Sequence, residues 1–119
     1  MARVLIVTFG FKYGPPPTNY YFDVSFAVNP ARQQNWSLFS QPEPGMVSFV
    51  LDQPDVSEFL SAVVPFIRAI IKFDDDARIG IGCNAGRHRS VIIAEEISRR
   101  LRLEKIEVSL MHREADFGL

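Results

Sequence analysis

The C-terminal half of the chain has the order strand, helix, strand, and this order restricts the fold more than any other feature of the sequence. Residues 77–83 (ARIGIGC) form a short apolar run that is typical of a buried strand. Residues 88–103 repeat apolar side chains at helical spacing, and residues 105–111 alternate apolar and polar side chains as a second strand does. Because a helix that joins two strands of one sheet forms a right-handed crossover, the two strands should be parallel.

The earlier residues add two more strands and a longer helix. Residues 3–9 (RVLIVTF) and 20–26 predict strands, and residues 55–73 predict an amphipathic helix that Pro65 should kink or split. The 119 residues suffice for one domain. We therefore expect an α/β fold: a single small domain over residues 1–119, with a mainly parallel sheet of about four strands and flanking helices.

Two segments lack a regular pattern. Residues 11–19 contain three consecutive prolines and must form a loop. Residues 28–45 contain three more prolines and the chain's one tryptophan, Trp36. An irregular segment of this length is usually a functional loop or disordered. We expect it either to cover a pocket or to form a dimer contact.

The composition excludes several classes of protein. With 47% hydrophobic and 23% charged residues the chain should fold, and its net charge of -1 argues against coating nucleic acid by bulk charge. One cysteine, Cys83, rules out an internal disulfide and favours the cytoplasm. No stretch offers the roughly 20 apolar residues of a membrane span. Two histidines and one cysteine give no zinc spacing, so we expect neither a metal nor a cofactor.

The turn between the strand at 77–83 and the following helix carries the strongest functional signal. Residues 82–90 have the sequence GCNAGRHRS, and basic residues outnumber acidic ones from Arg78 onward although the whole chain is slightly acidic. Such a turn directs backbone N–H groups to the positive end of a helix dipole, and its arginines add charge-assisted hydrogen bonds. We therefore expect it to bind a phosphate or another oxyanion. The residues expected to contact the anion are Asn84, Ala85, Gly86, Arg87, His88, Arg89 and Ser90.

Three other interpretations of this turn compete with a plain anion site. The Walker A motif is excluded, because it requires a Gly-Lys pair that the chain does not contain. The sequence GIGCNA at 80–85 is a weak dinucleotide fingerprint, because its first glycine falls inside the strand. Surface charges beside an ordinary helix start are the simplest alternative, but two arginines, a histidine and two glycines within one turn favour an anion site.

A sharper alternative is nucleophilic catalysis. Cys83, Arg89 and Ser90 have the spacing C-x5-R-S, which resembles the phosphate-binding loop of protein tyrosine phosphatases, where a thiolate attacks phosphorus and the arginine holds the oxygens. Gly82 stands where those enzymes usually have histidine, and no aspartate is clearly placed as the general acid, with Asp23 and Asp52 only candidates. A free cysteine is more often a small buried side chain. The sequence therefore favours a binding module over an enzyme, with a cysteine-dependent phosphatase as the alternative.

Four short segments follow the predicted strands, where parallel sheets bind ligands. They are FGFKYG at 9–14, FDV at 22–24 together with Asn29-Pro30, GCNAGRHRSV at 82–91, and HRE at 112–114. In this order they resemble the C-terminal domain of the RapZ (YvcJ-like) family of bacterial RNase adapter and nucleotide-binding proteins. The third segment is highly specific, and the resemblance covers nearly the whole chain.

The resemblance implies a regulatory domain that binds a phosphorylated small molecule, of which an amino-sugar phosphate is the best-supported type. The phosphate would lie on residues 84–89, and Lys12, Asp23, Asn29 and His112 would line the rest of the site. Some family members also bind small regulatory RNA and engage an RNase, and multi-domain members self-associate. An adapter that binds RNA or an RNase without catalysis, and a homodimer, are therefore further expectations.

The sequence departs from the family in three respects. Family members usually carry an N-terminal P-loop kinase-like domain, whereas this sequence begins at the first strand, so we expect a stand-alone domain. Asn84-Ala85 replaces a common Thr-Gly, which can alter the choice of ligand. RNA-binding members tend to end in a basic segment, whereas this chain ends EADFGL. Because phosphate contacts supply much of RNA affinity, this ending weakens the expectation of RNA binding.

Overall fold

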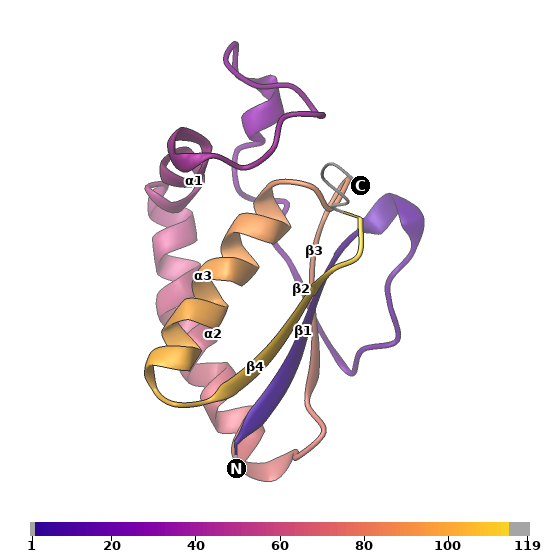
Figure 1. The fold of residues 1–119 in the computed structure, drawn as a ribbon, viewed down its shortest axis with the longest axis vertical. Helices are drawn as coiled ribbons and strands as arrows, with labels where there is room; N and C mark the ends of the chain where they lie inside the picture. Colours follow the sequence, from indigo (N-terminus) through magenta and orange to yellow (C-terminus); the bar gives the residue numbers. More distant parts are fainter. Residues whose placement is uncertain (1, 115–119) are drawn as a thin grey trace.

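Four parallel strands form the sheet. The computed structural model describes residues 2–114, and its strands are β1 (Arg3–Gly10), β2 (Tyr20–Asp23), β3 (Arg78–Cys83) and β4 (Glu107–His112). The order across the sheet is β2-β3-β1-β4, and every neighbouring pair is parallel (Figure 1). The predicted α/β fold with a mainly parallel sheet is confirmed.

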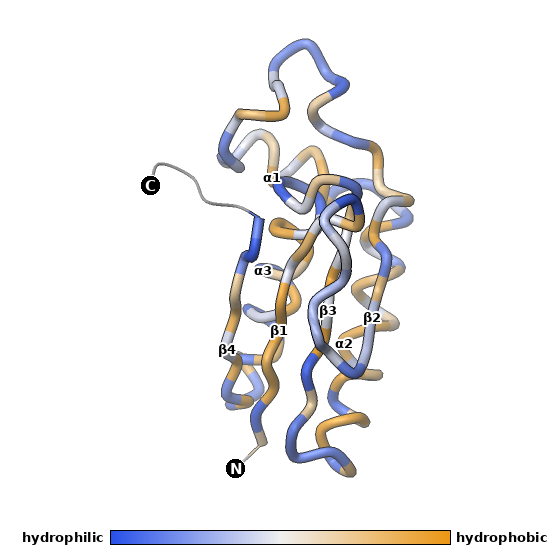
Figure 2. The backbone as a smooth tube through the Cα atoms, turned by 90° about the vertical axis from the view of Figure 1, so that its right-hand side faces the viewer, coloured by the Kyte–Doolittle hydropathy of each residue, from blue (hydrophilic) through white to orange (hydrophobic). Residues whose placement is uncertain are grey.

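Helices cover one face of the sheet. In chain order they are α1 (Pro44–Leu51), α2 (Pro54–Phe73) and α3 (Arg89–Leu103), with 3₁₀ turns η1 (Phe11–Tyr13) and η2 (Pro30–Arg32). Figure 2 shows the strands side by side with the helices behind them, while the segment between β1 and β2 crosses the opposite face. Within residues 2–114, no helix is both long and apolar enough to cross a membrane.

The hydrophobic core lies between the sheet and the helices. Ile79 and Ile81 of β3 are fully buried, as are Ile67 of α2 and Ile93 and Ile97 of α3. These side chains belong to one cluster of buried apolar residues. They meet because the helices repeat apolar residues at helical spacing, and each such face packs on the sheet. The same packing holds the carboxyl end of β3 beside the first turn of α3.

Helix α1 begins inside the segment 28–45 that the sequence predicts to be irregular. Its N-terminus is capped by Glu43, whose carboxylate accepts a hydrogen bond from the backbone N–H of Met46 at 2.8 Å. Pro44 occupies the first turn, where a helix requires no backbone donor. The prolines therefore start this helix instead of preventing it. The expected irregular segment is present over residues 28–43, apart from the 3₁₀ turn η2, and the helix replaces it at residues 44–45.

Two other elements differ from their predicted form. Strand β2 ends at Asp23 instead of continuing to residue 26, because Asp23 Oδ1 accepts a hydrogen bond from Ser25 N at 2.9 Å and turns the chain. Helix α2 runs through Pro65 as one helix of 20 residues, so the expected split does not occur. Pro65 and Ser61, the residue whose carbonyl loses its helical donor, are both exposed. Water can therefore satisfy that carbonyl.

Candidate anion-binding site

The turn between β3 and α3 packs directly against the end of β1. Gly86 has a φ of 73°, and a Cβ there would lie 2.4 Å from the backbone N of Gly10. A Cβ on Gly10 would in turn lie 2.6 Å from the backbone C and O of Ala85. Only glycine fits at both positions, since one requires a left-handed backbone and both require close approach. Residues 76 apart in sequence thus form one rigid edge of the site.

Several backbone N–H groups in this turn have no acceptor. Those of Ala85, Gly86 and His88 donate to no atom within residues 2–114. His88 immediately precedes α3, a helix of 15 residues, and its side chain does not cap that helix. Unpaired N–H groups at the positive end of a helix dipole favour an anion. This arrangement agrees with the electrostatics expected from the sequence.

A small cavity of about 90 Å³ opens beside Ala85 and His88, whereas Gly86 and Ser90 lie outside its lining. At roughly 30 Å³ for each water molecule in the liquid, this volume suits a single anion, and a larger ligand would extend out of it. Its lining comes from η1, the start of η2, the segment before α1, and the turn. The lining residues are Lys12, Asn29, Leu38, Cys83, Asn84, Ala85, Arg87, His88 and Arg89.

Arg89 lines the cavity and also holds the chain that follows β2. Its side chain is 8% exposed, and its Nη1 donates hydrogen bonds to the backbone oxygens of Ser25 at 2.9 Å and Ala27 at 3.1 Å. No other nitrogen of this guanidinium has an acceptor within residues 2–114. One side of the guanidinium is thus fixed by the protein, and the other donors remain for a ligand.

Arg87 and His88 bind the segment that precedes α1. Arg87 Nε donates to the backbone O of Leu38 at 3.1 Å, and His88 Nε2 lies 2.6 Å from the backbone O of Ser40. Since a carbonyl only accepts, His88 Nε2 must carry the hydrogen. Burial lowers the pKa of His88, and the nearby charges of Arg87 and Arg89 lower it further, although the bond to Ser40 opposes the shift. His88 is therefore neutral near pH 7.

Cys83 and Ser90 lie beneath the turn and are both buried. The Cys83 thiol donates a hydrogen bond to Ser90 Oγ at 3.3 Å. Cys83 lines the cavity, but no acidic side chain of the described residues does so. Of the two candidate general acids, Asp23 accepts a hydrogen bond from Ser25 N at 2.9 Å, and both Asp23 and Asp52 lie outside the lining. The geometry therefore unites the thiol, the hydroxyl and the arginine without a carboxyl group in the described lining, and Glu114 beside the turn accepts a hydrogen bond from Gly10 N at 3.0 Å.

The residues expected from the family resemblance divide into two groups. Lys12 and Asn29 line the cavity: Lys12 Nζ lies 5.3 Å from the ring centroid of Tyr13, and Asn29 Oδ1 accepts a hydrogen bond from Ala31 N at 3.0 Å. Asp23 and His112 do not line it. Among residues 2–114, no group of three His, Cys, Asp or Glu side chains could hold a metal ion.

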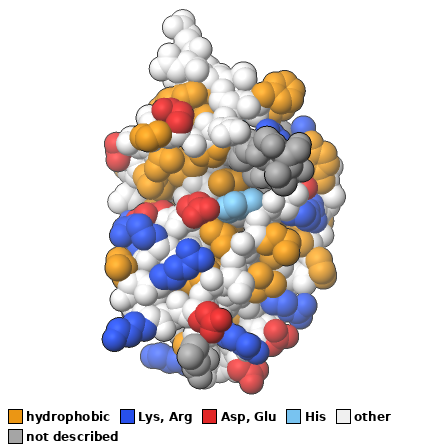
Figure 3. All heavy atoms as spheres, in the orientation of Figure 1, with side chains coloured by type: hydrophobic (Ala, Val, Ile, Leu, Met, Phe, Trp, Pro, Cys, Tyr) orange, Lys and Arg blue, Asp and Glu red, His pale blue; other side chains and the backbone are white. Residues whose placement is uncertain are grey.

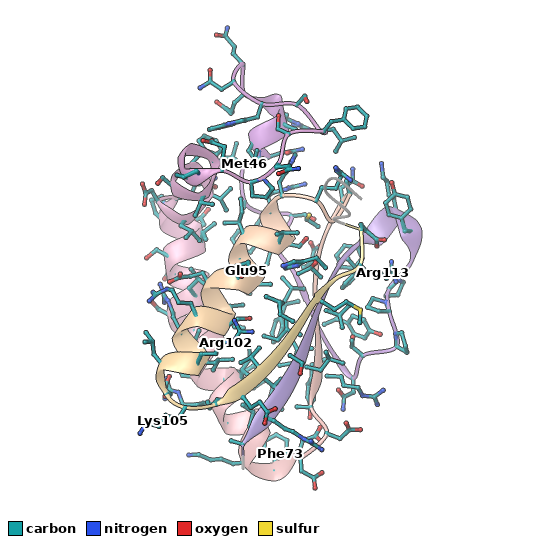
Figure 4. The ribbon with its side chains drawn as sticks, viewed as in Figure 1. Met46, Phe73, Glu95, Arg102, Lys105 and Arg113 are labelled. Atoms are coloured by element: carbon teal, nitrogen blue, oxygen red, sulfur yellow. The ribbon has the colours of Figure 1, made fainter. Side chains whose placement is uncertain are left out.

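His112 belongs to a different concavity. Its Nδ1 lies 2.8 Å from Thr8 Oγ1, and its Nε2 lies 2.8 Å from Glu95 Oε1. Both His112 and Glu95 line an open groove of about 800 Å³ between α1, α3 and β4. Figure 3 shows hydrophobic side chains gathered around α1 and the nearby part of α3 on this face, and Figure 4 labels Glu95 and Arg102 along α3.

The groove is larger than the cavity at the turn, but the charged side chains that line it are already paired. Arg99 and Arg100 both bond to Glu96 at 2.8 Å and lower the pKa of that carboxyl to about 2. Arg102 Nη2 donates to the backbone O of Val108 at 3.1 Å. The cavity at the turn is the better candidate for a charged ligand, because its backbone donors are unpaired.

Sequence reasoning missed the site residues that act through their backbone. Leu38 lines the cavity, and the carbonyls of Ser25, Ala27 and Ser40 accept from the basic side chains of the turn. Every residue has a carbonyl, so no pattern in the sequence could have marked these positions. The acidic C-terminal end lies outside the described residues from position 115 onward.

The fold and this edge of the sheet define a small parallel α/β domain whose candidate site lies at the carboxyl ends of its strands. The chain belongs to the RapZ C-terminal domain family, which it matches over residues 2–116. It is 34% identical to "Nucleotide-binding protein" of Desulfovibrio desulfuricans over 98% of this chain and 39% of that protein. The identity is 36% to the protein of that name in Trichlorobacter lovleyi, over 97% of this chain and 42% of that protein. The chain thus spans about two fifths of the length of these relatives.

Proposed function

We propose that this domain is a regulatory module that binds a phosphorylated small molecule, with the phosphate seated on residues 84–90. The observation that carries the proposal is the set of unpaired N–H groups of Ala85, Gly86 and His88 at the N-terminus of α3. Lys12 and Arg89 add positive charge to the same cavity. The two relatives are named as nucleotide-binding proteins, which fits a ligand of this chemistry.

The ligand that the family resemblance favours is an amino-sugar phosphate. A cavity of about 90 Å³ accommodates the phosphate, so the sugar would extend along Lys12 and Asn29 at its margin. The polar side chains there suit hydroxyl and amino groups. Asn84-Ala85, which replaces the common Thr-Gly, lies within the lining and would affect the choice among such ligands.

Thermal unfolding with inorganic phosphate, a hexosamine phosphate and sulfate at matched ionic strength tests the proposal. A ligand that binds only the folded state raises the midpoint. Lys12→Ala should weaken phosphate binding about two- to fivefold, because Lys12 is an exposed cation near the anion. Lys72→Ala, which removes an exposed lysine of α2 outside the cavity lining, should leave the affinity unchanged. If no anion raises the midpoint, the proposal fails.

A cysteine-dependent phosphatase is the second candidate, because Cys83, Ser90 and Arg89 come together beside the cavity. The absence of an acidic side chain from the described lining counts against it. Turnover of an aryl phosphate that is lost in Cys83→Ser would favour this candidate. Phosphate binding that is unchanged in Cys83→Ser, without turnover in the wild type, would favour the binding module.

Binding of RNA or an RNase is a separate proposal that follows from the resemblance alone. The arginines of α3 give it little support, since Arg99 and Arg100 are both paired with Glu96. RNA binding through phosphate contacts would weaken steeply with added salt. A homodimer is likewise an expectation from the family.

A further inference from the structure

We propose that residues 37–41, called the strap below, form a ligand-responsive cover over the anion cavity, and that an anion competes with the strap for Arg87. This inference rests on the proposed function, because it concerns the regulation of the same cavity. It begins from two contacts described above: Arg87 Nε donates to Leu38 O at 3.1 Å, and His88 Nε2 donates to Ser40 O at 2.6 Å.

The strap uses donors that an anion in the cavity would also use. Leu38, Arg87 and His88 all line the cavity, so the strap's carbonyls lie at its margin. A carbonyl is a neutral acceptor, whereas a phosphate oxygen carries charge. Hydrogen bonds between a guanidinium and an anionic oxygen are about twice as strong as those to a neutral group. An anion that enters the cavity can therefore draw Arg87 away from Leu38.

The strap is built so that it can move without unfolding the domain. It belongs to the loop between η2 and α1, which projects at the top of Figure 1, and the side chain of Phe39 is 81% exposed. Its own turn is closed by two hydrogen bonds: Ser40 N donates to Ser37 O at 3.1 Å, and Ser37 N donates to Ser40 Oγ at 2.9 Å. Loss of the Arg87 contact thus removes an attachment of the strap but no part of the hydrophobic core.

An anchored tryptophan stands directly before the strap. The ring of Trp36 packs on Phe49 of α1 at 5.7 Å between centroids, and its Nε1 donates to Glu43 Oε1 at 3.0 Å. Movement of the strap would change the environment of Trp36 and the exposure of Leu38 and Phe39. Anion binding in the cavity would then change the apolar surface that the protein exposes beside α1.

If the strap competes with the anion, weakening the strap should raise the affinity for the anion. If the strap only supports the cavity, weakening it should lower that affinity. Coupling between two sites is reciprocal. If the strap and the anion compete, a protein whose strap is weakened must therefore bind the anion more tightly. Ser40→Ala removes one of the two hydrogen bonds that close the strap's turn and leaves every cavity-lining side chain in place. Loss of about one hydrogen bond should make inorganic phosphate bind roughly two- to tenfold tighter. If the strap were a supporting wall, the same substitution would weaken binding.

The experiment titrates three proteins with inorganic phosphate: the wild type, Ser40→Ala and the control Ser57→Ala. Calorimetry measures the affinity, and Trp36 fluorescence reports the movement of the strap. Ser57 is an exposed serine of α2 and should leave the affinity unchanged. The expected result is tighter binding in Ser40→Ala only, and a phosphate-dependent change in acrylamide quenching of Trp36 in the wild type. Faster hydrogen exchange at Ser37 N in Ser40→Ala checks that the strap has been loosened.

The outcomes separate this inference from the proposed function. Phosphate binding with equal or lower affinity in the loosened Ser40→Ala protein would overturn the strap and leave the anion site standing. Phosphate binding without any change in Trp36 quenching would also overturn the strap. No phosphate binding in any of the three proteins would overturn both proposals.

Discussion

Arg87, His88 and Arg89 each donate a hydrogen bond to a backbone carbonyl of the segment between β2 and α1. The sequence predicts their charge and their place at a helix start, because glycines and arginines around a strand-to-helix turn are visible in any single sequence. It could not predict their protein acceptors, which are carbonyls without a sequence pattern. These residues therefore organise a loop as well as offering donors to an anion, and a substitution at any of them should affect both.

The burial of His88 predicts how stability depends on pH. Burial lowers its pKa in the folded protein below the ordinary value of 6.5, while the unfolded chain keeps that value. As the pH falls below about 6.5, His88 is protonated in the unfolded state but remains neutral in the folded state. The stability supplied by neutral His88 is therefore lost progressively. Thermal midpoints measured between pH 5 and pH 7.5 should fall with acidity more steeply in the wild type than in His88→Gln. Equal slopes in the two proteins would show that His88 titrates normally.

Secondary-structure elements were predictable where their pattern was long or strongly apolar. Helix α3 begins one residue after its predicted start, and α2 one residue before its predicted start. Helix α1 was not predictable, because it has only 8 residues and its buried side chains are just Met46 and Val50. In so short a helix, the capping carboxylate of Glu43 marks the helix start more clearly than the spacing of apolar residues does. The prolines nearby favour a loop in a sequence-based prediction, so this start was missed.

Helix α2 gives a prediction at the scale of the element. Pro65 interrupts the hydrogen bonds of an exposed helix face, and a proline inside a helix costs up to about 3 kcal/mol relative to alanine. Pro65→Ala should therefore raise the free energy of unfolding by about 1–3 kcal/mol in urea titrations. Ala69→Gly, at another exposed position of the same helix, should lower it by about 1 kcal/mol and serves as the matched comparison. A loss of stability in Pro65→Ala would mean that the proline ring makes packing contacts that alanine cannot replace.

At the scale of the whole molecule, the cavity is an assembly of segments from the first and last thirds of the chain. Lys12, Asn29 and the turn were expected together on the strength of the family resemblance, and the structure brings them to one cavity. His112 was expected with them but lies in the groove beside α3, because β4 is an edge strand next to β1 and Glu95 and Thr8 hold its ring. The position of His112 outside the cavity thus follows from the strand order of the sheet, which no local sequence pattern encodes.

The contact between Gly10 and the turn joins β1 to the last third of the chain, and it holds the cavity in shape. A Cβ on Gly10 would lie 2.6 Å from the backbone of Ala85, and backbone cannot move aside as a flexible side chain can. Gly10→Ala should therefore lower the free energy of unfolding by about 1–3 kcal/mol, as overpacking does. Because the turn must shift, it should also reduce the rise in thermal midpoint that phosphate produces. Ser57→Ala is the control, since Ser57 is an exposed residue of α2 and lies outside the cavity lining. A full phosphate response in Gly10→Ala would mean that the anion does not require the present geometry of the turn.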